Sequence, residues 1–270
     1  MIRSLWSGAT GMKSQQTAVD VIANNLANVN TVGYKTEKAE FKSLLYQTLQ
    51  TKTTSSDGSP KPVTGQVGLG TRNSSVKAIF TQGNMNASES PSAFAIQGDG
   101  FFAVAGPNGT RYTRNGDFTW ALSNNGIALT TSDGYNVLDT NGNPITLSSD
   151  YTTSNLTITA NGTLCYPDAA NNAQSLGITI GLYQFNNAAG LERVGDSSYE
   201  VTAASGPAIN EATSNNITKS TMTQGYLEAS NVSVADEMVN LIIAQRAYEM
   251  NSKAITTSDS MMDTANNLKR

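Results

Sequence analysis

The chain has 270 residues, 17 of them basic and 21 acidic, with a formal net charge of -4 and one cysteine. This balance argues against a nucleic-acid backbone or an anionic membrane as the main partner, and one cysteine forms neither an intramolecular disulfide nor a metal site. With no histidine, the chain lacks the base of Ser-His and Cys-His hydrolases and the commonest zinc ligand. The sequence predicts no enzyme, no cofactor and no metal site.

An amphipathic helix is predicted at the N-terminus. Leu5, Met12, Val19 and Leu26 recur every seven residues, and Ile22 extends the same apolar stripe. The stripe is narrow, so the helix is expected to need a partner.

Three asparagines stand near the end of this helix, where they weaken it because their amides compete with backbone hydrogen bonds. Asn24 and Asn28 share one helical face, and Asn25 lies between them. We interpret them as register-setting contacts at a helix interface. Asn28, Asn30 and Gly33 also suit the helix exit, since these residue types tolerate the left-handed conformation. Solvated amides on a frayed last turn are the alternative.

The centre of the chain predicts strands. Residues 46–75 are expected to form an extended connecting arm, because residues 51–70 are rich in Gly, Pro, Ser and Thr. Residues 76–224 predict a mostly antiparallel β domain. Segments such as 98–104 and 111–120 alternate apolar and polar residues, and Asn-Gly and Asp-Gly pairs give strong hairpin signals.

A second, stronger heptad pattern predicts a C-terminal helix that runs to about residue 265. Ser230 or Ser233 can cap its start, and Asp236 and Glu237 suit the positive end of the helix dipole. Its apolar positions are Val234, Met238, Leu241, Tyr248, Ile255 and Met262.

Together these elements predict an α+β fold, in which residues 1–45 and 225–270 form a coiled-coil domain and the β domain is inserted between them. Half of the expected apolar stripe is polar, so a helical hairpin would bury too little area to stay ordered alone. Stacking against copies of the same chain would supply the missing contacts, and a head-to-tail interface that does not close gives an open filament. A private hairpin packed on its own domain is the alternative. The expected subunit interface comprises Leu5, Met12, Val19, Ile22, Asn24, Asn25, Leu26, Asn28, Val234, Met238, Leu241, Tyr248, Ile255 and Met262.

The terminal sequences resemble those of a known family. "DVIANNLANVNTVGYK", "FKSLLYQTLQ" and the stretch that begins "QGYLEASNVSVADEMVNLIIAQRAYEMN" are similar to the terminal signatures of the bacterial flagellar rod and hook family. "TQGNMNASESPSAFAIQGDGFFAV" and "YTRNGDFTW" resemble the segment that leads into its β domain. Within the family the likeness is closest to distal rod subunits.

The resemblance implies a structural subunit that polymerises into a straight tube, transmits motor torque to the hook and surrounds an export channel. The implied partners are copies of itself, proximal rod subunits, hook subunits or the hook-rod junction, the P and L rings as a bushing, and the flagellar export apparatus. It implies a location in the basal body, at the level of the periplasm and outer membrane, reached without a cleaved signal peptide and without membrane insertion. A proximal rod or hook subunit is the nearest alternative.

The resemblance also assigns roles to particular segments. The terminal helices would line the tube, with polar residues such as Ser14, Gln15 and Gln16 providing a non-adhesive lining. Residues 46 to about 70 match the place of a segment thought to make the distal rod straight and stiff.

One stretch has the spacing of a calcium loop. Asp139, Asn141, Asn143 and Asp150 stand at EF-hand-like positions, but Pro144 replaces the glycine and Asp150 is shorter than the usual Glu. We expect a hairpin turn there.

The alternative from another class is a module that binds or hydrolyses cell-wall carbohydrate. Asp117, Asp133 and Asp139 are its candidate carboxylates. Each is beside a turn glycine, where Asp is ordinarily structural.

Overall fold

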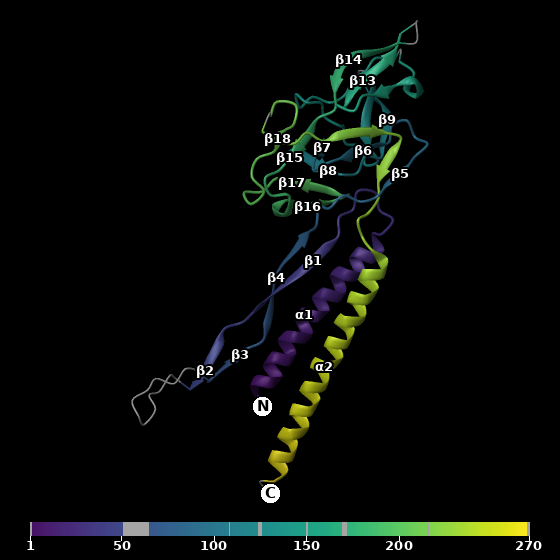
Figure 1. Ribbon diagram of the computed structural model, residues 1–270. Helices are drawn as coiled ribbons and strands as arrows, with labels where there is room; N and C mark the ends of the chain where they lie inside the picture. Colours follow the sequence, from purple (N-terminus) through teal and green to yellow (C-terminus); the bar gives the residue numbers. More distant parts are fainter. Residues whose placement is uncertain are drawn as a thin grey trace. The chain divides into compact units, whose positions relative to one another are not determined.

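The computed structural model describes residues 2–50, 65–107, 109–123, 126–149, 151–168, 172–214 and 216–268. The chain forms two compact units (Figure 1). Unit 1 comprises Met1–Ala27, Glu37–Lys77 and Ser233–Arg270, and unit 2 comprises Asn28–Thr36 and Ala78–Val232. The chain therefore passes between the units four times.

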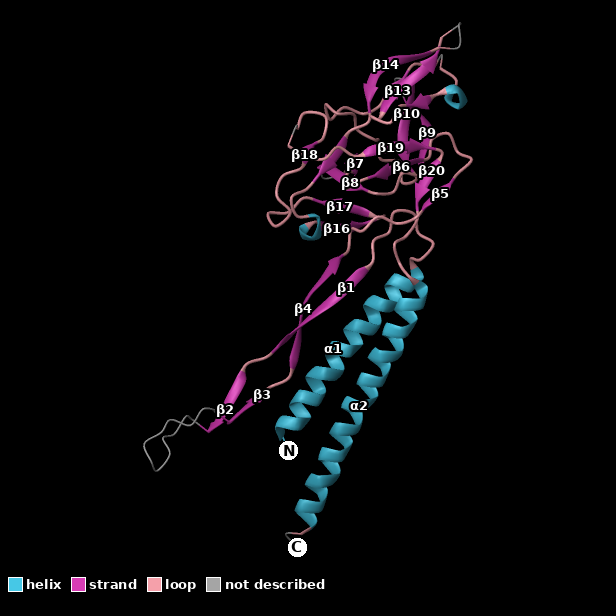
Figure 2. Cartoon of the chain, viewed as in Figure 1, coloured by secondary structure: helices cyan, strands magenta, loops and turns pink. Residues whose placement is uncertain are grey.

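Two helices dominate unit 1 (Figure 2). α1 spans Ile2–Ala27 and α2 spans Val234–Asn267, and they lie side by side. Ser233 is the N-cap of α2, since its Oγ accepts a hydrogen bond of 3.5 Å from the backbone N of Asp236. The expected cap and helix are confirmed. Neither helix, over the residues described, is long and apolar enough to cross a membrane.

Two-stranded ribbons complete the described part of unit 1. They are formed by β1 (Glu37–Ser43), β2 (Tyr46–Gln50), β3 (Gly65–Gly68) and β4 (Thr71–Ala78). β1 pairs with β4, and β2 pairs antiparallel with β3. Lys77 and Glu40 form an ion pair between β4 and β1. Part of the expected arm therefore consists of paired strands, whereas its residues 51–64 lie outside the described residues.

Unit 2 is the β-rich part of the chain. Its strands are β5 (Met85–Ala87), β6 (Phe94–Gln97), β7 (Phe101–Gly106), β8 (Gly109–Thr113), β9 (Phe118–Ser123), β10 (Gly126–Thr131), β11 (Thr146–Leu147), β12 (Thr157–Ile158), β13 (Thr163–Pro167), β14 (Ala173–Thr179), β15 (Leu182–Gln184), β16 (Glu192–Gly195), β17 (Ser198–Glu200), β18 (Ile209–Asn210), β19 (Thr221–Gln224) and β20 (Tyr226–Glu228). Two short 3₁₀ helices, η1 (Thr153–Asn155) and η2 (Ala188–Gly190), interrupt them.

The largest sheet of unit 2 has six strands in the order β16-β17-β8-β7-β15-β18. Smaller sheets follow the orders β11-β10-β9, β12-β13-β14, β19-β6 and β20-β5. Neighbouring strands in these sheets run antiparallel. The expected mostly antiparallel β region and the α+β class are confirmed.

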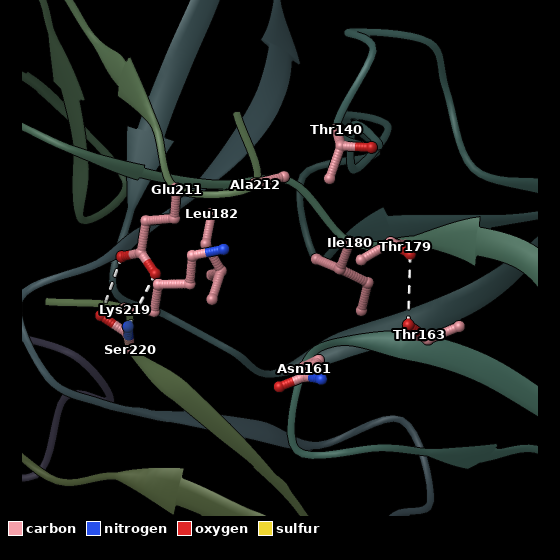
Figure 3. Close-up of a pocket in the computed structure, with 10 residues that line it drawn as sticks. All are labelled: Thr140, Asn161, Thr163, Thr179, Ile180, Leu182, Glu211, Ala212, Lys219 and Ser220. Carbon is pink, nitrogen blue, oxygen red and sulfur yellow. Dashed lines mark hydrogen bonds between the residues drawn. The ribbon is translucent and has the colours of Figure 1, made fainter. Parts of the chain in front are cut away.

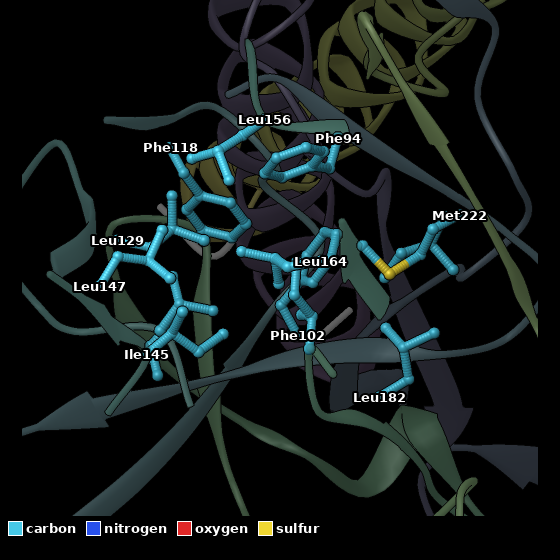
Figure 4. Close-up of a cluster of buried hydrophobic side chains, with 14 residues drawn as sticks. Phe94, Phe102, Phe118, Leu129, Ile145, Leu147, Leu156, Leu164, Leu182 and Met222 are labelled. Carbon is cyan, nitrogen blue, oxygen red and sulfur yellow. The ribbon is translucent and has the colours of Figure 1, made fainter. Parts of the chain in front are cut away.

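The core of unit 2 lies on both faces of β7. Phe102 and Val104 enter a large aliphatic and aromatic cluster, part of which is shown in Figure 4. Phe101 and Ala103 enter a second cluster, which contains Tyr199. Because successive side chains of a strand point to opposite faces, four consecutive buried residues place β7 inside the unit. The single cysteine, Cys165, is buried in β13 as expected from its strand context.

The limits of the units differ from the expected 1–45, 46–75, 76–224 and 225–270. Residues 28–36 belong to unit 2, although they follow α1 directly. Residues 225–232 also belong to unit 2, because β20 pairs with β5 before α2 begins. Both terminal signatures therefore contribute to the β-rich unit as well as to the helices.

The hairpin that joins β16 to β17 is strained. Asp196 and Ser197 have φ of 52° and 53°, a conformation that non-glycine residues rarely adopt. Ser197→Gly is expected to raise the free energy of unfolding by up to about 1 kcal/mol, because glycine removes the Cβ penalty. Ser132→Gly, at an exposed turn position without positive φ, should lower it. Equal effects of the two changes in chemical denaturation would contradict this assignment.

Candidate assembly site

The helices of unit 1 approach closely because α1 carries glycines on the side that faces α2. A Cβ added at Gly8 would lie 2.9 Å from Ile255 Cγ1, and one at Gly11 would lie 2.8 Å from Asn251 Nδ2. Interiors are packed without room for such overlap, so a larger residue at either position would push the helices apart.

The contact between α1 and α2 is thin and partly polar. The buried residues of described α2 are Glu237, Ala244 and Ser258, and Ser258 Oγ lies 3.0 Å from Ser4 Oγ. Small and polar side chains remove little apolar area from water. The hydrophobic stabilisation of this pair within one chain is therefore modest.

Asn25 joins α1, β1 and α2. Its side chain is 1% exposed. Nδ2 donates to Glu37 O at 2.8 Å and to Glu237 Oε1 at 3.2 Å, and Oδ1 accepts from Glu37 N at 2.9 Å. The amide thus pairs with both backbone groups of Glu37, as a neighbouring strand would. Asn25 acts inside its own chain, which differs from the contact with a neighbouring subunit that we expected.

Glu237 is held in this contact at an electrostatic cost. Burial raises the pKa of the Glu237 carboxyl above its usual value. The hydrogen bond from Asn25 opposes this shift in pKa, and the negative charge of Asp236 adds to it. The amide of Asn25 is therefore the group that favours the ionised form here.

Polar residues of α1 hold strand β4. Thr71 N donates to Thr10 Oγ1 at 3.4 Å, Ser14 Oγ lies 3.2 Å from Thr71 Oγ1, and Asn73 Nδ2 donates to Thr17 Oγ1 at 2.6 Å. These positions recur every three or four residues, so they share one side of the helix. Ser14 is 4% exposed, and its expected place in a channel lining is therefore wrong.

The predicted interface residues occupy three environments. Leu5, Met12, Val19, Ile22, Leu26, Leu241, Ile255 and Met262 are half-buried in unit 1, and Asn28 is half-buried in unit 2. Asn24, Val234, Met238 and Tyr248 are exposed, and Asn25 is buried. The expected heptad of α2 is therefore divided between the contact with α1 and solvent. Its role in contacts between subunits stays a prediction.

A second apolar row on α2 was not predicted. It consists of Val239, Ile243, Met250, Ala254 and Met261, all exposed, and we call it the outer seam. Successive members are separated by four, seven, four and seven residues, which is the spacing of one helical side. This spacing was the signal that could have identified the outer seam.

A groove of about 440 Å³ lies between the two helices. It is lined by Gln16, Val19, Gln245, Tyr248 and Glu249 and is called the interhelical groove below. Tyr248 is 44% exposed at its surface. Unit 1 thus carries two distinct surface features, the apolar outer seam on α2 and the interhelical groove of mixed polarity.

The β2–β3 ribbon also exposes large apolar side chains. Tyr46 and Leu49 of β2 are 61% and 55% exposed, and Leu45, directly before β2, is 83% exposed. A two-stranded ribbon is marginally stable alone in water. The ribbon therefore has the surface of an element that packs against another molecule.

Within unit 2, a buried carboxylate joins the two terminal parts of the chain. Glu228 is 1% exposed. Its Oε1 accepts from Lys35 Nζ at 2.6 Å and from Gly83 N at 3.0 Å, and its Oε2 accepts from Arg114 Nη1 at 3.3 Å. Lys35 follows α1 in sequence and Glu228 precedes α2. The ion pairs therefore fix both connecting segments to the β-rich unit.

Burial of two cations with one carboxylate requires further hydrogen bonds. Lys35 Nζ also donates to Thr81 O at 2.8 Å, and Arg114 Nη2 donates to Gly98 O at 2.6 Å. Burial lowers the pKa of Lys35 and that of Arg114, and the charge of Glu228 opposes both shifts. Glu228 is thus the largest of the contributions that favour the charged forms of both side chains, and Asp99 contributes in the same direction.

Backbone contacts complete this site. Gly33 has a φ of +68°, and a Cβ there would lie 2.7 Å from the backbone of Arg114. Its N donates to Glu228 O at 2.8 Å. Asn231 Oδ1 accepts from both N and Oγ1 of Thr36 at 2.7 Å. We call Gly33, Lys35, Arg114, Glu228 and Asn231 the terminal clamp.

Sequence reasoning missed the terminal clamp. Its signal was a pair of opposite charges, Lys35 and Glu228, each inside a terminal signature of a chain with only 14% charged residues. The terminal signatures were interpreted only as helices. Lys35 and Glu228, which lie in these signatures outside the helices, were therefore assigned no function.

Unit 2 contains a hollow of about 290 Å³ (Figure 3), which we compared with the site that a cell-wall hydrolase needs. It is lined by Thr140, Asn161, Thr163, Thr179, Ile180, Leu182, Glu211, Ala212, Lys219 and Ser220. Glu211 is the only carboxylate among them, and its oxygens accept from Ser220 N at 2.7 Å, Ser220 Oγ at 2.8 Å and Gln184 Nε2 at 2.8 Å. Glycosidases of the usual kind need two carboxylates about 5–10 Å apart. The hollow does not supply that pair.

The calcium-like stretch forms a turn. Asp139 Oδ1 accepts from the backbone N of Asn141 and of Asn143, each at 2.8 Å. This is the local bonding by which Asp stabilises a turn. Asp150 lies outside the described residues, and the described residues hold no group of three acidic or cysteine side chains arranged for a metal.

Profiles of three flagellar families match the chain. The "Flagella basal body rod protein" profile matches residues 5–35, the "Flagellar hook protein FlgE/F/G D1 domain" profile residues 95–166, and the "Flagellar basal body rod FlgEFG protein C-terminal" profile residues 223–268. The chain is thus an axial protein of the bacterial flagellum, in the rod and hook class. None of the three descriptions names an enzymatic activity.

Relatives that match over their full length show which family within the rod and hook class the chain belongs to. The chain is 43% identical to the flagellar basal-body rod protein FlgG of Borreliella burgdorferi over 100% of both chains. It is 37% identical to that of Bacillus subtilis over 100% of both chains, and 41% identical to that of Caulobacter vibrioides over 99% of this chain and 100% of the relative. The chain belongs to the FlgG family of flagellar basal-body rod proteins. It is a structural subunit of the distal rod, as the terminal signatures predicted.

Proposed function

We propose that the terminal helices of this chain polymerise as a coiled-coil layer around an export channel, and that the resulting straight tube transmits motor torque to the hook. The observation that carries the proposal is the apolar surface of α2. Val239 is 56% exposed, Ile243 60% and Met250 64%. Clustered exposed apolar side chains mark protein-protein contacts, and a rod made of repeated subunits supplies such contacts along its length.

The thin contact between α1 and α2 supports the same proposal. The buried residues of described α2 are few, and Val239, Ile243, Met250 and Met261 of the same helix are exposed. Helices gain most of their stability from packing of an apolar face. Neighbouring copies of the chain would bury the faces that one chain leaves open.

The names of the relatives, which describe basal-body rod proteins, support a proposal for the further partners. We propose proximal rod subunits at one end, and hook subunits or the hook-rod junction at the other. The P and L rings are the proposed bushing around the shaft, and the flagellar export apparatus is the proposed delivery route without a cleaved signal peptide. The proposed level is the periplasm and outer membrane.

Electron microscopy of polymers grown from the purified chain tests this function. Straight hollow filaments are the expected result. Curved filaments would favour a hook-like subunit, and a chain that stays monomeric at the highest soluble concentration would contradict self-assembly.

We further propose that residues 46 to about 70, within the connecting arm, make the tube stiff. The exposed side chains of Tyr46 and Leu49 on β2, and of Leu45 directly before it, support contact with an adjacent copy. Replacing all three by serine is expected to leave polymerisation intact but to yield bent filaments. Gln47→Ser with Thr48→Ser is the matched control on the same strand. Straight filaments from the triple variant would remove the stiffening role.

A further inference from the structure

Residues 221–231, close to the C-terminal limit of unit 2, are called the closing segment below. The closing segment contains β19 and β20. β19 pairs antiparallel with β6, and β20 pairs antiparallel with β5, as Figure 2 shows. β6 carries Phe94 and Ile96 of the main core cluster. A strand in the interior of unit 2 therefore obtains a partner from the last part of that unit in the sequence.

Side chains of the closing segment reach further parts of unit 2. Met222 is 4% exposed and belongs to the main core cluster. The amide of Gln224 bridges two stretches of backbone, since its Nε2 donates to Pro91 O at 2.7 Å and to Leu156 O at 2.9 Å. Its Oε1 accepts from Ile158 N at 3.0 Å. The closing segment thus joins β12 to the stretch of chain that leads into β6.

The closing segment also supplies the carboxylate that two buried cations need. The side chains of Lys35 and Arg114 are 0% and 1% exposed, and both form ion pairs with Glu228. A buried charge without its partner is strongly unfavourable, so detachment of Glu228 would draw both cations towards water. Arg114 directly follows β8 of the six-stranded sheet. Detachment would therefore disturb that sheet as well.

The chain that follows α1 is held by the closing segment. Gly33 N donates to Glu228 O at 2.8 Å, and Tyr34 O accepts from Asn231 N at 3.4 Å. Thr36 N and Thr36 Oγ1 both donate to Asn231 Oδ1 at 2.7 Å. Such contacts between distant parts of the chain close a long loop, whose entropy must be lost before the contacts form.

We infer that the closing segment is a strap that completes unit 2, so that the unit and residues 33–36 fold together and only when residues 221–231 take part. In any process that delivers the chain from its N-terminus, this segment arrives late. Most of the chain then stays unfolded until little more than α2 remains to be delivered. The inference concerns a single chain and goes beyond the proposed function; it also explains how the chain would remain extended in the proposed export route.

Hydrogen exchange of the full-length monomer in increasing denaturant tests the inference. The amides to compare are those of β7 and three that depend on the closing segment: Gly33 N, Met222 N, which donates to Ala160 O at 2.9 Å, and Ala229 N, which donates to Asn84 O at 2.8 Å. All of them should show the same opening constant and the same denaturant dependence, because one cooperative unfolding exposes them. Opening constants of Met222 and Ala229 more than about 10-fold larger than those of β7 would show that the segment detaches from a folded unit.

Asn231→Ala provides a second, independent readout in the full-length chain. It leaves backbone groups around Thr36 without their partner, so the opening constant of β7 should rise about 10-fold, and that of Gly33 and Ala229 by the same factor. Asn186→Ala is the matched control at an exposed position of unit 2 and should change none of them. A rise at Gly33 and Ala229 without a rise in β7 would overturn the inference. Because exchange is measured on the monomer, either result leaves the proposed self-assembly untouched.

Discussion

Replacement of Glu228 by glutamine is expected to lower the free energy of unfolding of unit 2 by about 3–5 kcal/mol. The carboxylate is 1% exposed and faces two buried cations, Lys35 and Arg114. Glutamine keeps the shape but removes the charge, so both cations remain buried without compensation. Because folded domains are stable by only about 5–15 kcal/mol, this single change removes a large part of the total.

Denaturant unfolding followed by the fluorescence of Trp120, which packs against the core of unit 2, measures this loss. Glu192→Gln is the matched control, since Glu192 is exposed in the same unit. It should change stability by less than about 0.5 kcal/mol. A loss in Glu228→Gln no larger than in this control would mean that the terminal clamp does not stabilise the unit.

A second variant separates charge from shape. Lys35→Met in the Glu228→Gln background removes one of the two unpaired cations and should restore part of the lost stability. Lys35→Met alone should be destabilising, because Glu228 then loses its hydrogen bond of 2.6 Å. This non-additivity, measured as a double-mutant cycle, is the signature of direct coupling.

Much of the fold follows from local signals in the sequence. Heptad spacing predicted α1 and α2, and Ser230 and Ser233 were the candidate caps of α2, of which Ser233 is the N-cap in the structure. Glycine-containing turns divided the middle into antiparallel strands. These features depend on residues close together in the sequence, and for that reason periodicity and turn chemistry were sufficient.

The terminal clamp and the role of Asn25 depend on long-range contacts. Lys35 and Glu228 are 193 positions apart, and no local pattern indicates that they meet. Asn25 was assigned to a subunit contact because asparagine is unfavourable inside a helix, but its partners Glu37 and Glu237 are in the same chain. A polar residue in an otherwise apolar segment indicates that its side chain forms a hydrogen bond or an ion pair. The sequence does not show which residue is the partner.

The outer seam was missed for a different reason, which concerns the periodicity of α2. The pattern through Val234, Leu241 and Tyr248 was read as the whole apolar side of α2. In the structure this heptad is shared between α1 and solvent, and Ile243 and Met250 form another row. A helix that contacts partners on several sides carries overlapping periodicities, so a single best heptad underestimates its apolar surface.

The second large effect is expected from Leu241→Asp. Leu241 is half-buried in unit 1, on the heptad of α2. A carboxylate there either loses water when subunits pack or keeps them apart, and an unpaired buried charge costs several kcal/mol. A cost of about 3 kcal/mol in one contact weakens it more than 100-fold. Cells that carry this variant should form no rod and should not swim.

Unit 2 should remain folded in the Leu241→Asp chain, because its core and terminal clamp do not include Leu241. Hydrogen exchange of the purified variant should therefore show protected β7 and β8 beside rapidly exchanging helices. Asn240→Asp adds the same charge one residue away at an exposed position and should support swimming. Normal swimming by Leu241→Asp would exclude this heptad from the subunit contact, whereas loss of protection in unit 2 would attribute the motility defect to misfolding.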